Sequence, residues 1–255
     1  QDLGHQVFPV PLELIRHDYL LKEYFKKIQP DCIFNLAAYG NHSNQTDDHE
    51  TIKVNIEYLY NVLQAGNNIN YKALINFSTS SLTLPYTTFY SASKKAGEEI
   101  VKAFVNKYHR PIVNIRPYSV YGEGEADFRF IPTMIRSMVK HEKMKVSVGV
   151  HDWIYVDDLI DAILLIVENA TKFKGQVVEI GTGRSYSNFA VVEIMEKISG
   201  KSVPCNYQTE LLRPYDTDKW EANNWLIKEL GWKQKTSLEE GLKKCYAYYK
   251  QRFEA

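Results

Sequence analysis

Apolar segments that alternate with amphipathic helical segments constrain the fold of this chain more than any other sequence feature. Residues 32–40 and 73–81 are apolar runs of strand length that end in small or hydroxyl-bearing residues. Residues 54–66 and 90–108 have the length and the apolar spacing of helices. Strands separated by helices of this length predict βαβ units and a parallel sheet covered on both faces. The sequence therefore predicts an α/β protein with a doubly wound parallel sheet.

The same alternation extends to both sides of these segments. Residues 18–28 place apolar side chains on one helical face and lysines on the other, while residues 111–120 and 131–140 predict a further strand and helix. Residues 4–10 predict a turn followed by a short strand. After about residue 122 the predicted elements become shorter, which indicates a smaller C-terminal lobe.

Charge and cysteine content argue against several classes of protein. Lys and Arg together number 31, as do Asp and Glu, so no net charge favours nucleic acid or an anionic membrane. Cys32, Cys205 and Cys245 form no CxxC pair, which argues against a disulfide framework and a structural zinc site. No apolar run reaches the roughly 18 residues of a membrane span, and no signal peptide opens the chain. We expect a cytoplasmic protein without a membrane span or a bound metal.

A tyrosine and a lysine four residues apart are the strongest catalytic candidates. Tyr90 and Lys94 stand in YSASK at the start of a predicted helix, so they share one helical face about one turn apart. A cation at that distance favours the phenolate and lowers the tyrosine pKa towards neutral pH. The hydroxyl run of residues 78–81, at the end of a predicted strand, offers a group that can hold a substrate oxygen. A Tyr and a Lys at this spacing are common in proteins. The catalytic interpretation therefore depends on the motifs around the pair.

Several further motifs occur in one order around this pair. They are NLAAYG at a strand end, Asn55 in the next helix, the hydroxyl run, YSASKKAGEE, IRPYSVYGEG and DWIYVDDLIDAI. Together they closely resemble the extended short-chain dehydrogenase/reductase family, which includes NAD-dependent nucleotide-sugar epimerases and dehydratases. The resemblance covers residues 4–250 and implies a Rossmann-like fold, with an NAD(P)-binding domain at residues 1–122 and parts of 145–182. Residues 123–145 and 183–255 then form a nucleotide-sugar-binding lobe.

The resemblance also implies roles for individual residues. Tyr90 is the acid/base that exchanges the proton of a sugar hydroxyl, and Lys94 lowers its pKa and binds the cofactor ribose. Ser80, with Thr79 as the alternative, holds the substrate oxygen. The implied cofactor contacts are Ala37, Ala38, Tyr39, Asn55, Tyr90, Lys94, Pro117 and Tyr118. The implied nucleotide-sugar contacts are Ser80, Ser119, Arg129, Phe130, His151, Arg213 and Asp216.

The chain departs from the family pattern at several places. Ser119 stands where many relatives have Asn, and His151 stands where Arg is common. The family begins with a strand and a Gly-rich turn that holds the dinucleotide pyrophosphate, and no such turn precedes Gly4. We therefore expect that first strand and its turn to be absent from this sequence, together with part of the loop between Ser80 and Tyr90.

The residues that follow Ser80 favour epimerisation among the reactions of the family. Dehydratases carry an acidic pair there because elimination needs its own acid and base, whereas this chain has Ser81 and Leu82. We expect transient oxidation of a nucleotide-linked sugar at C4, with a 4-keto-sugar reductase or a 4,6-dehydratase as alternatives. A nucleotide-binding member without turnover is the non-enzymatic alternative. NAD is the expected cofactor, and NADP stays open because residues 9–12 carry no selecting side chain.

Other polar residues around these motifs have structural interpretations. The carboxylates at residues 157–161 lie at a predicted helix start, where they cap the helix and complement its dipole. Glu98 and Glu99 are expected to face solvent. The helix at residues 54–66 and the helix that begins at Tyr90 are, by the same resemblance, the expected homodimer surface, paired as a four-helix bundle.

Overall fold

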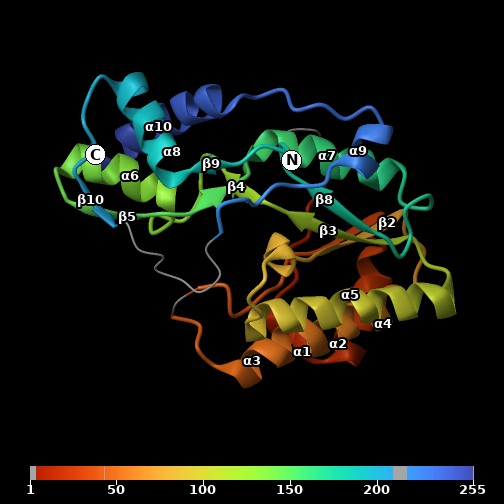
Figure 1. Ribbon diagram of the computed structural model, residues 1–255. Helices are drawn as coiled ribbons and strands as arrows, with labels where there is room; N and C mark the ends of the chain where they lie inside the picture. The colour runs from red at the N-terminus through yellow and green to blue at the C-terminus, as the bar shows by residue number, and fades with distance from the viewer. Residues whose placement is uncertain (1–3, 43, 209–216, 255) are drawn as a thin grey trace. The chain divides into compact units, whose positions relative to one another are not determined.

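The computed structural model describes residues 4–42, 44–208 and 217–254 (Figure 1). The chain forms two compact units, each assembled from separate stretches of sequence. The first unit contains Gln1–Ser78, Thr88–Ile115 and Val167–Val177. The second contains Thr79–Thr87, Arg116–Ile166 and Val178–Ala255. Helices and parallel strands make up both units, which confirms the predicted α/β class.

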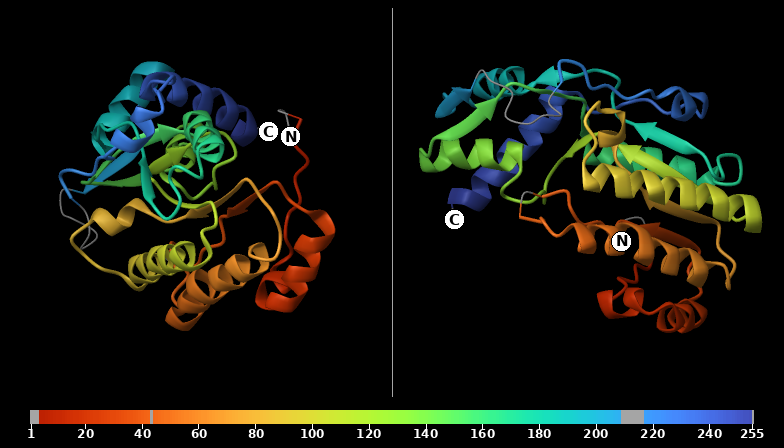
Figure 2. Two further views of the ribbon diagram at one scale, coloured as in Figure 1. Left: turned by 90° about the vertical axis from the view of Figure 1, so that its right-hand side faces the viewer. Right: turned by 60° about the horizontal axis from the view of Figure 1, so that its bottom comes forward.

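The first unit consists of parallel strands and the helices that follow each of them. Its elements are α1 (Leu12–Arg16), α2 (Asp18–Ile28), β1 (Cys32–Asn35), α3 (Asp48–Ile52), η1 (Lys53–Glu57), α4 (Tyr58–Gly66), β2 (Ala73–Phe77), α5 (Phe89–Tyr108) and β3 (Ile112–Pro117). The main sheet has the order β1-β2-β3-β8, where β8 is Val177–Ile180. Strand β2 pairs in parallel with both β1 and β3. Helices α2, α4 and α5 lie in a row along one face of these strands (Figure 2).

The core of this unit forms where that helical row meets the sheet. Ile33, Leu74 and Ile112, one from each strand, are buried together against apolar side chains of the three helices. Alternate residues of a strand share a face, so the next position on each strand also points towards the helices. That next position is an asparagine in all three strands.

The three asparagines form a buried row of amides across the sheet. Asn35, Asn76 and Asn114 are register partners and at most 7% exposed. Asn35 Nδ2 donates to Asn76 Oδ1 at 2.9 Å, and Asn76 Nδ2 donates to Asn114 Oδ1 at 2.8 Å. Parallel strands are usually apolar on both faces, and here two hydrogen bonds link the three buried amides through Asn76, while Asn114 Nδ2 at the end of the row has no hydrogen-bond partner. The row fixes the relative register of the three strands.

Substitution of the central asparagine tests this row. Asn76→Ala leaves the Asn35 Nδ2 donor and the Asn114 Oδ1 acceptor buried without the Asn76 partner that each has in the native protein, which is expected to lower the free energy of unfolding by about 2–4 kcal/mol. Urea denaturation followed by circular dichroism measures this loss. The exposed Asn70→Ala is the control and should change stability by less than about 0.5 kcal/mol. A loss below about 1 kcal/mol for Asn76→Ala would contradict the structural role.

The second unit has shorter elements around an aromatic core. Its elements, some shared with the first unit at their ends, are η2 (Ser80–Thr83), β4 (Ser119–Tyr121), α6 (Phe130–Lys140), β5 (Met144–Ser147), β6 (Val150–His151), β7 (Trp153–Tyr155), α7 (Val156–Glu168), β8, β9 (Tyr186–Ser187), α8 (Asn188–Ser199), β10 (Cys205–Gln208), α9 (Trp225–Glu229) and α10 (Leu238–Glu254). Tyr121 and Tyr249 are among the largest fully buried side chains, and they pack with residues of α6, α8 and α10. Strand β4 pairs in parallel with β7, and β5 pairs in parallel with β10. None of the helices in the described parts of the chain combines the length and apolar character that a membrane crossing requires.

Several predicted elements match the structure and others do not. The helix predicted at residues 18–28 is α2, and the helix predicted from Tyr90 is α5, which begins at Phe89. The strand predicted within residues 4–10 is wrong, because those residues are largely exposed and no described strand takes up their hydrogen bonds. The helix predicted at 54–66 begins earlier, at Asp48, where Asp47 accepts hydrogen bonds from the first free amides.

Strand β1 is shorter and less buried than its apolar sequence predicts. It ends at Asn35 instead of continuing to residue 40. Phe34 is 43% exposed and Leu36 is 62% exposed, because β1 is the end strand of the described sheet and one of its faces lies open. The apolar run therefore predicted the strand correctly, whereas the prediction that both faces of this strand are buried was wrong.

Candidate active site

The start of α5 is fixed by its own sequence. Thr88 Oγ1 accepts from the Ser91 amide at 3.0 Å, and Ser91 Oγ accepts from the Thr88 amide at 2.8 Å, which is a reciprocal capping box. The helix therefore begins at Phe89, one residue before Tyr90, and carries Tyr90 and Lys94 one turn apart on a common face. Tyr90 is half-buried and Lys94 is only 6% exposed.

Burial of Lys94 changes its acid–base behaviour. Loss of hydration disfavours the charged amine and lowers the pKa of Lys94 to about 8, while the negative charge of Glu98 opposes that decrease. An amine with this pKa is protonated for the most part at pH 7. Its positive charge is therefore available to stabilise a phenolate on Tyr90.

The side chain of Asn55 joins the end of β1 to the start of α5. Its Oδ1 accepts from the Tyr39 amide at 3.0 Å, and its Nδ2 donates to the Tyr39 carbonyl oxygen at 2.8 Å and to Ser93 Oγ at 2.9 Å. Ser93 Oγ in turn donates to the carbonyl oxygen of Tyr90 at 2.8 Å. Asn55 lies in the π-helical turn η1, which interrupts the helical run between α3 and α4; such turns often occur at functional sites. The junction fixes the Tyr39 backbone relative to Tyr90.

Gly40 brings the β1 loop into close contact with α5. Its φ of +95° suits glycine, and a Cβ there would lie 2.9 Å from Thr51 Oγ1 and 3.5 Å from Tyr90 Cβ. Ala37 is partly buried and Ala38 is exposed in the same loop, so two small side chains lie next to each other just after β1. The first unit thus brings together six of the predicted site residues: Ala37, Ala38, Tyr39, Asn55, Tyr90 and Lys94.

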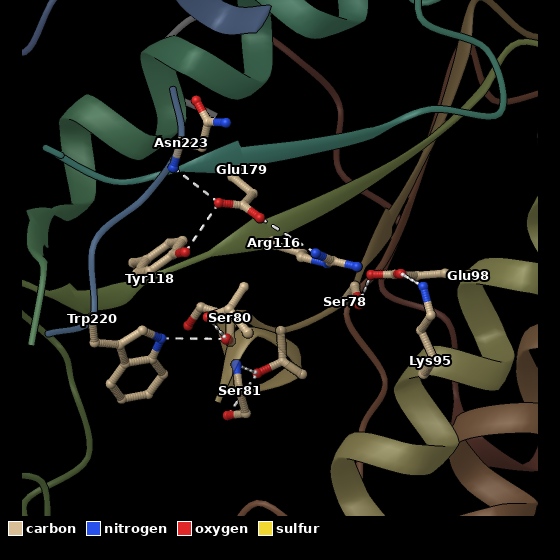
Figure 3. A network of polar contacts seen from close by, with 12 residues as sticks. Ser78, Ser80, Ser81, Lys95, Glu98, Arg116, Tyr118, Glu179, Trp220 and Asn223 are labelled. Atoms are coloured by element: carbon tan, nitrogen blue, oxygen red, sulfur yellow. Dashed lines mark hydrogen bonds and ion pairs between the residues drawn. The ribbon is translucent and has the colours of Figure 1, made fainter. Parts of the chain in front are cut away.

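Glu98, which the sequence led us to place in solvent, is buried. Its side chain is 2% exposed, whereas the side chain of the adjacent Glu99 is 59% exposed. Ser78 Oγ, just beyond the end of β2, donates to Glu98 Oε1 at 2.6 Å. Lys95 Nζ lies 3.5 Å from the other carboxylate oxygen (Figure 3). The solvent-facing prediction is wrong for Glu98 because it lies four residues after Lys94, on the face that α5 buries.

The second unit holds Ser80 and the predicted contacts to the nucleotide sugar. Ser80 begins η2 and is 4% exposed. Trp220 Nε1 donates to the Ser80 carbonyl oxygen at 3.3 Å, and the Trp220 ring lies 6.2 Å from the ring of Tyr118 (Figure 3). These contacts hold the hydroxyl-bearing turn against the residues that follow β3. Pro117 is the last residue of β3.

Ser119 and His151, the two departures from the family pattern, contact each other. Ser119 Oγ lies 3.0 Å from His151 Nδ1. The imidazole ring lies 5.2 Å from the indole of Trp153 and 5.2 Å from that of Trp220. Arg129 is the N-cap residue of α6, and Phe130 packs at 5.8 Å from Trp153. Arg213 and Asp216 lie outside the described residues.

Two carboxylates in the second unit accept several hydrogen bonds in this region. The sequence analysis did not identify either of them. Glu179 accepts from Arg116, Tyr118 and the Asn223 amide, at 3.3, 3.0 and 2.9 Å (Figure 3). Burial, followed by the charge of Glu179, raises the pKa of Tyr118 well above its usual range. Asp152 is fully buried and accepts from the backbone amides of Thr182, Gly183 and Ala222, as well as from the Thr182 hydroxyl. A charged residue inside the apolar motif DWIYV was the available signal for Asp152.

The carboxylates at the start of α7 have structural contacts. Asp157 and Asp158 lie in the first turn of the helix, as the dipole interpretation predicts. Asp158 also accepts from the amides of Lys235 and Thr236, and Asp161 pairs with the Lys235 amine at 2.5 Å. Within the described residues, no group of three or more His, Cys, Asp or Glu side chains is arranged to hold a metal.

The sequence matches the model of the NAD dependent epimerase/dehydratase family over residues 10–181. The chain belongs to this family, which confirms the resemblance drawn from its motifs. It is 32% identical to CDP-abequose synthase of Salmonella muenchen over 162 residues, which are 62% of this chain and 55% of that protein. The chain thus spans about half the length of this relative.

Solved structures of the family share the fold. UDP-glucuronic acid 4-epimerase of Bacillus cereus, in complex with UDP-glucuronic acid and NAD, is 25% identical and superposes with a TM-score of 0.81 over 91% of this chain and 78% of that one. UDP-glucose 4-epimerase of Thermotoga maritima, at 24% identity, superposes with a TM-score of 0.83 over 93% of this chain and 83% of that one. The Rossmann-like fold is therefore confirmed.

The depressed pKa of Lys94 predicts how stability depends on pH. The unfolded chain holds this proton up to about pH 10.5, whereas the folded protein releases it near pH 8, so the unfolded state binds more protons between these values. Stability of the native protein relative to Lys94→Met should therefore rise by about 2–3 kcal/mol between pH 7 and pH 10. Urea denaturation of both proteins across this range measures the change. Lys95→Met, which removes a 53% exposed amine, should show no comparable trend; equal trends would contradict the assignment to Lys94.

Proposed function

We propose that this chain is the catalytic part of an NAD-dependent epimerase that inverts a nucleotide-linked sugar at C4. The observation that carries the proposal is the Tyr90–Lys94 pair, held on a capped helix and joined through Asn55 to the loop after β1. Membership in an NAD dependent family and similarity to a UDP-glucuronic acid 4-epimerase with bound NAD support the cofactor and the reaction. NADP remains the alternative cofactor.

The residues of the first unit fit a nicotinamide dinucleotide. Ala37 and Ala38 place two small side chains just after β1, and the Asn55 amide holds the Tyr39 backbone in place. The buried amine of Lys94 supplies a donor for ribose hydroxyls. Pro117 and Tyr118 are proposed to contribute backbone contacts. When bound, NAD accepts a hydride from the sugar carbon and returns it.

The protein residues manage the proton that accompanies this exchange. The Tyr90 phenolate removes the proton of the C4 hydroxyl and returns it after the sugar has turned, which is general base and then general acid catalysis. The Lys94 ammonium, one helical turn away on the same face, is proposed to stabilise this phenolate by its charge. Ser80, or Thr79 in its place, is proposed to donate a hydrogen bond to the sugar oxygen.

Binding of the nucleotide sugar is assigned to the second unit. Ser119, His151, Arg129 and Phe130 are proposed to contact the nucleotide and its diphosphate, together with Arg213 and Asp216. The hydrogen bond between Ser119 and His151 supports a joint role for these two residues. A histidine flanked by indole rings can carry positive charge, which suits a diphosphate.

A 4-keto-sugar reductase is the second candidate. The acid/base pair required for reduction is the same. A dehydratase ranks lower because Ser81 and Leu82 follow Ser80 and supply no carboxylate. Product analysis separates the three reactions: an epimer without net change in NAD, a 4-hydroxyl product with consumption of NAD(P)H, or a 4-keto-6-deoxy sugar. Bound NAD without any turnover would indicate the non-enzymatic alternative.

Substitution of the tyrosine tests the proposed reaction. With full-length protein and a panel of nucleotide sugars, Tyr90→Phe is expected to lower kcat by about 10²–10⁴-fold, because it removes the proton acceptor and leaves the ring in place. Binding of NAD, measured by calorimetry, should persist. The exposed Tyr19→Phe is the matched control and should retain full activity. Activity that survives Tyr90→Phe would refute the mechanism.

We also propose that the protein is a cytoplasmic homodimer that pairs through α4 and α5. The described cysteines are all free, which supports a reducing compartment. A groove of about 700 Å³ runs along α4 and α5 in the first unit, lined by Tyr60, Gln64, Ala103 and Lys107 among others. Tyr60 is 49% exposed there, so a second copy could cover it in a four-helix arrangement.

A charge placed in this groove tests the dimer. Ala103→Arg puts a long cation where two copies of α5 would meet, and a monomer should result. Light scattering coupled to size exclusion measures the mass. Ala247→Arg adds the same side chain on the exposed face of α10 and should leave a dimer intact. A wild-type mass near 29.6 kDa would refute the homodimer.

A further inference from the structure

We propose that Glu98, held by Ser78, is a positioning residue that keeps Lys94 protonated one helical turn from Tyr90. Neither Glu98 nor Ser78 was assigned a role by the motifs above. This inference rests on the proposed function of Tyr90 and Lys94, because their chemistry gives the carboxylate its purpose. The geometry of one helix face and one strand end supports it.

The three side chains lie at regular intervals along α5. Tyr90, Lys94 and Glu98 follow one another at four-residue spacing, so each lies about one turn from the next on the same face. Lys94 and Glu98 are 6% and 2% exposed. A half-buried phenol, a buried amine and a buried carboxylate thus follow one another along the helix face, with the amine between the other two.

Ser78 fixes the carboxylate from the sheet side. Its Oγ donates to Glu98 Oε1 at 2.6 Å, and its own amide donates to the Ile115 carbonyl oxygen at 2.8 Å. Ser78 therefore connects Glu98 to the paired ends of β2 and β3. A hydrogen bond donated to a carboxylate favours its ionised form. The hydrogen bond from Ser78 therefore favours the negative over the neutral form of the buried Glu98 side chain.

A buried carboxylate at this place has a direct electrostatic effect on the amine. Burial alone would drive the Lys94 proton off, and the charge of Glu98 counteracts that loss. Neutral Lys94 would no longer stabilise the phenolate of Tyr90. Glu98 therefore sets the upper end of the pH range in which ammonium and phenolate coexist.

Lys95 is a charged neighbour of this line of side chains. Lys95 is 53% exposed and shares its charge between Glu98 and Glu99, so it faces the carboxylate from the solvent side. From the neighbouring elements of the first unit, Ser78 at the end of β2 contacts Glu98 and Asn55 of η1 contacts Ser93. Arg116, at the end of β3 in the second unit, has an ion pair with Glu179 at 3.3 Å.

Isosteric removal of the charge is the decisive experiment. Glu98→Gln keeps the shape of the side chain and removes its charge, so the alkaline limb of the kcat profile should move to lower pH by about one unit and kcat at pH 9 should fall about tenfold. Glu98→Asp keeps the charge and should restore the alkaline limb. Ser78→Ala should shift the limb in the same direction as Glu98→Gln, by less. Glu99→Gln, on the exposed side of the same turn, is the control and should not shift it.

A measurement that needs no substrate separates this inference from the proposed function. The Lys94 amine can be titrated by lysine NMR in the full-length protein, with Lys94→Met to assign its signal. A lower titration midpoint in Glu98→Gln than in Glu99→Gln supports the inference even if no nucleotide sugar is turned over, in which case only the proposed function fails. An unchanged midpoint in both Glu98→Gln and Ser78→Ala overturns it. If Glu98→Gln does not fold, the comparison of Ser78→Ala with wild type decides.

Discussion

Burial of the Lys94 amine is the constraint on which the organisation of the first unit depends. A charged amine in a position with 6% exposure is unfavourable unless nearby groups compensate for its lost hydration. The compensation comes from the carboxylate of Glu98, which must itself be buried and hydrogen-bonded. Ser78 provides that hydrogen bond from the end of β2. One functional charge therefore determines residues on α5 and on the sheet.

Other buried polar side chains of the first unit also require hydrogen-bond partners. Asn55 fastens the β1 loop to α5 through three hydrogen bonds, and two hydrogen bonds link the amides of Asn35, Asn76 and Asn114 across the strands. A buried polar group without a hydrogen-bond partner destabilises the folded state, and a hydrogen bond between two such groups requires a particular geometry. They restrict the first unit to one register and one approach of α5, which an apolar core of similar volume would specify less tightly.

Much of this unit could be predicted from sequence because its signals are local. The apolar spacing of α2 and the Thr88 cap of α5 both act within a few residues, and the structure follows them. The start of α3 was missed because its cap, Asp47, lies in a polar run that also suits a loop. The π-helical turn at Asn55 was missed because hydrogen bonds distant in sequence stabilise it. No periodicity reports such a turn.

Glu98 was misjudged although a usable signal existed. Adjacent helical residues point about 100° apart, so Glu98 and Glu99 cannot both face solvent equally. Once Lys94 is placed on the buried face by its catalytic role, its i+4 neighbour belongs to that face as well, and only Glu99 is left outside. Applying the spacing rule beyond the YxxxK motif would have found the residue. By contrast, Glu179 and Asp152 act through backbone amides more than 25 residues away, which sequence spacing does not show.

The hydrogen-bond networks around Lys94 and around Glu179 lie in different units. This separation suggests how members of one family can catalyse different reactions. The pKa of Lys94 is set by burial and by Glu98, both within the first unit, so the acid/base pair does not need a particular sugar site to be active. The second unit contains the turn at Ser80, the Glu179 cluster and the contact between Ser119 and His151. Under the proposed function, substitutions there would change which sugar is held, and whether a further acid or base follows Ser80, without disturbing the Tyr90–Lys94 pair. Epimerase and dehydratase chemistry would then share the first unit and differ in the second.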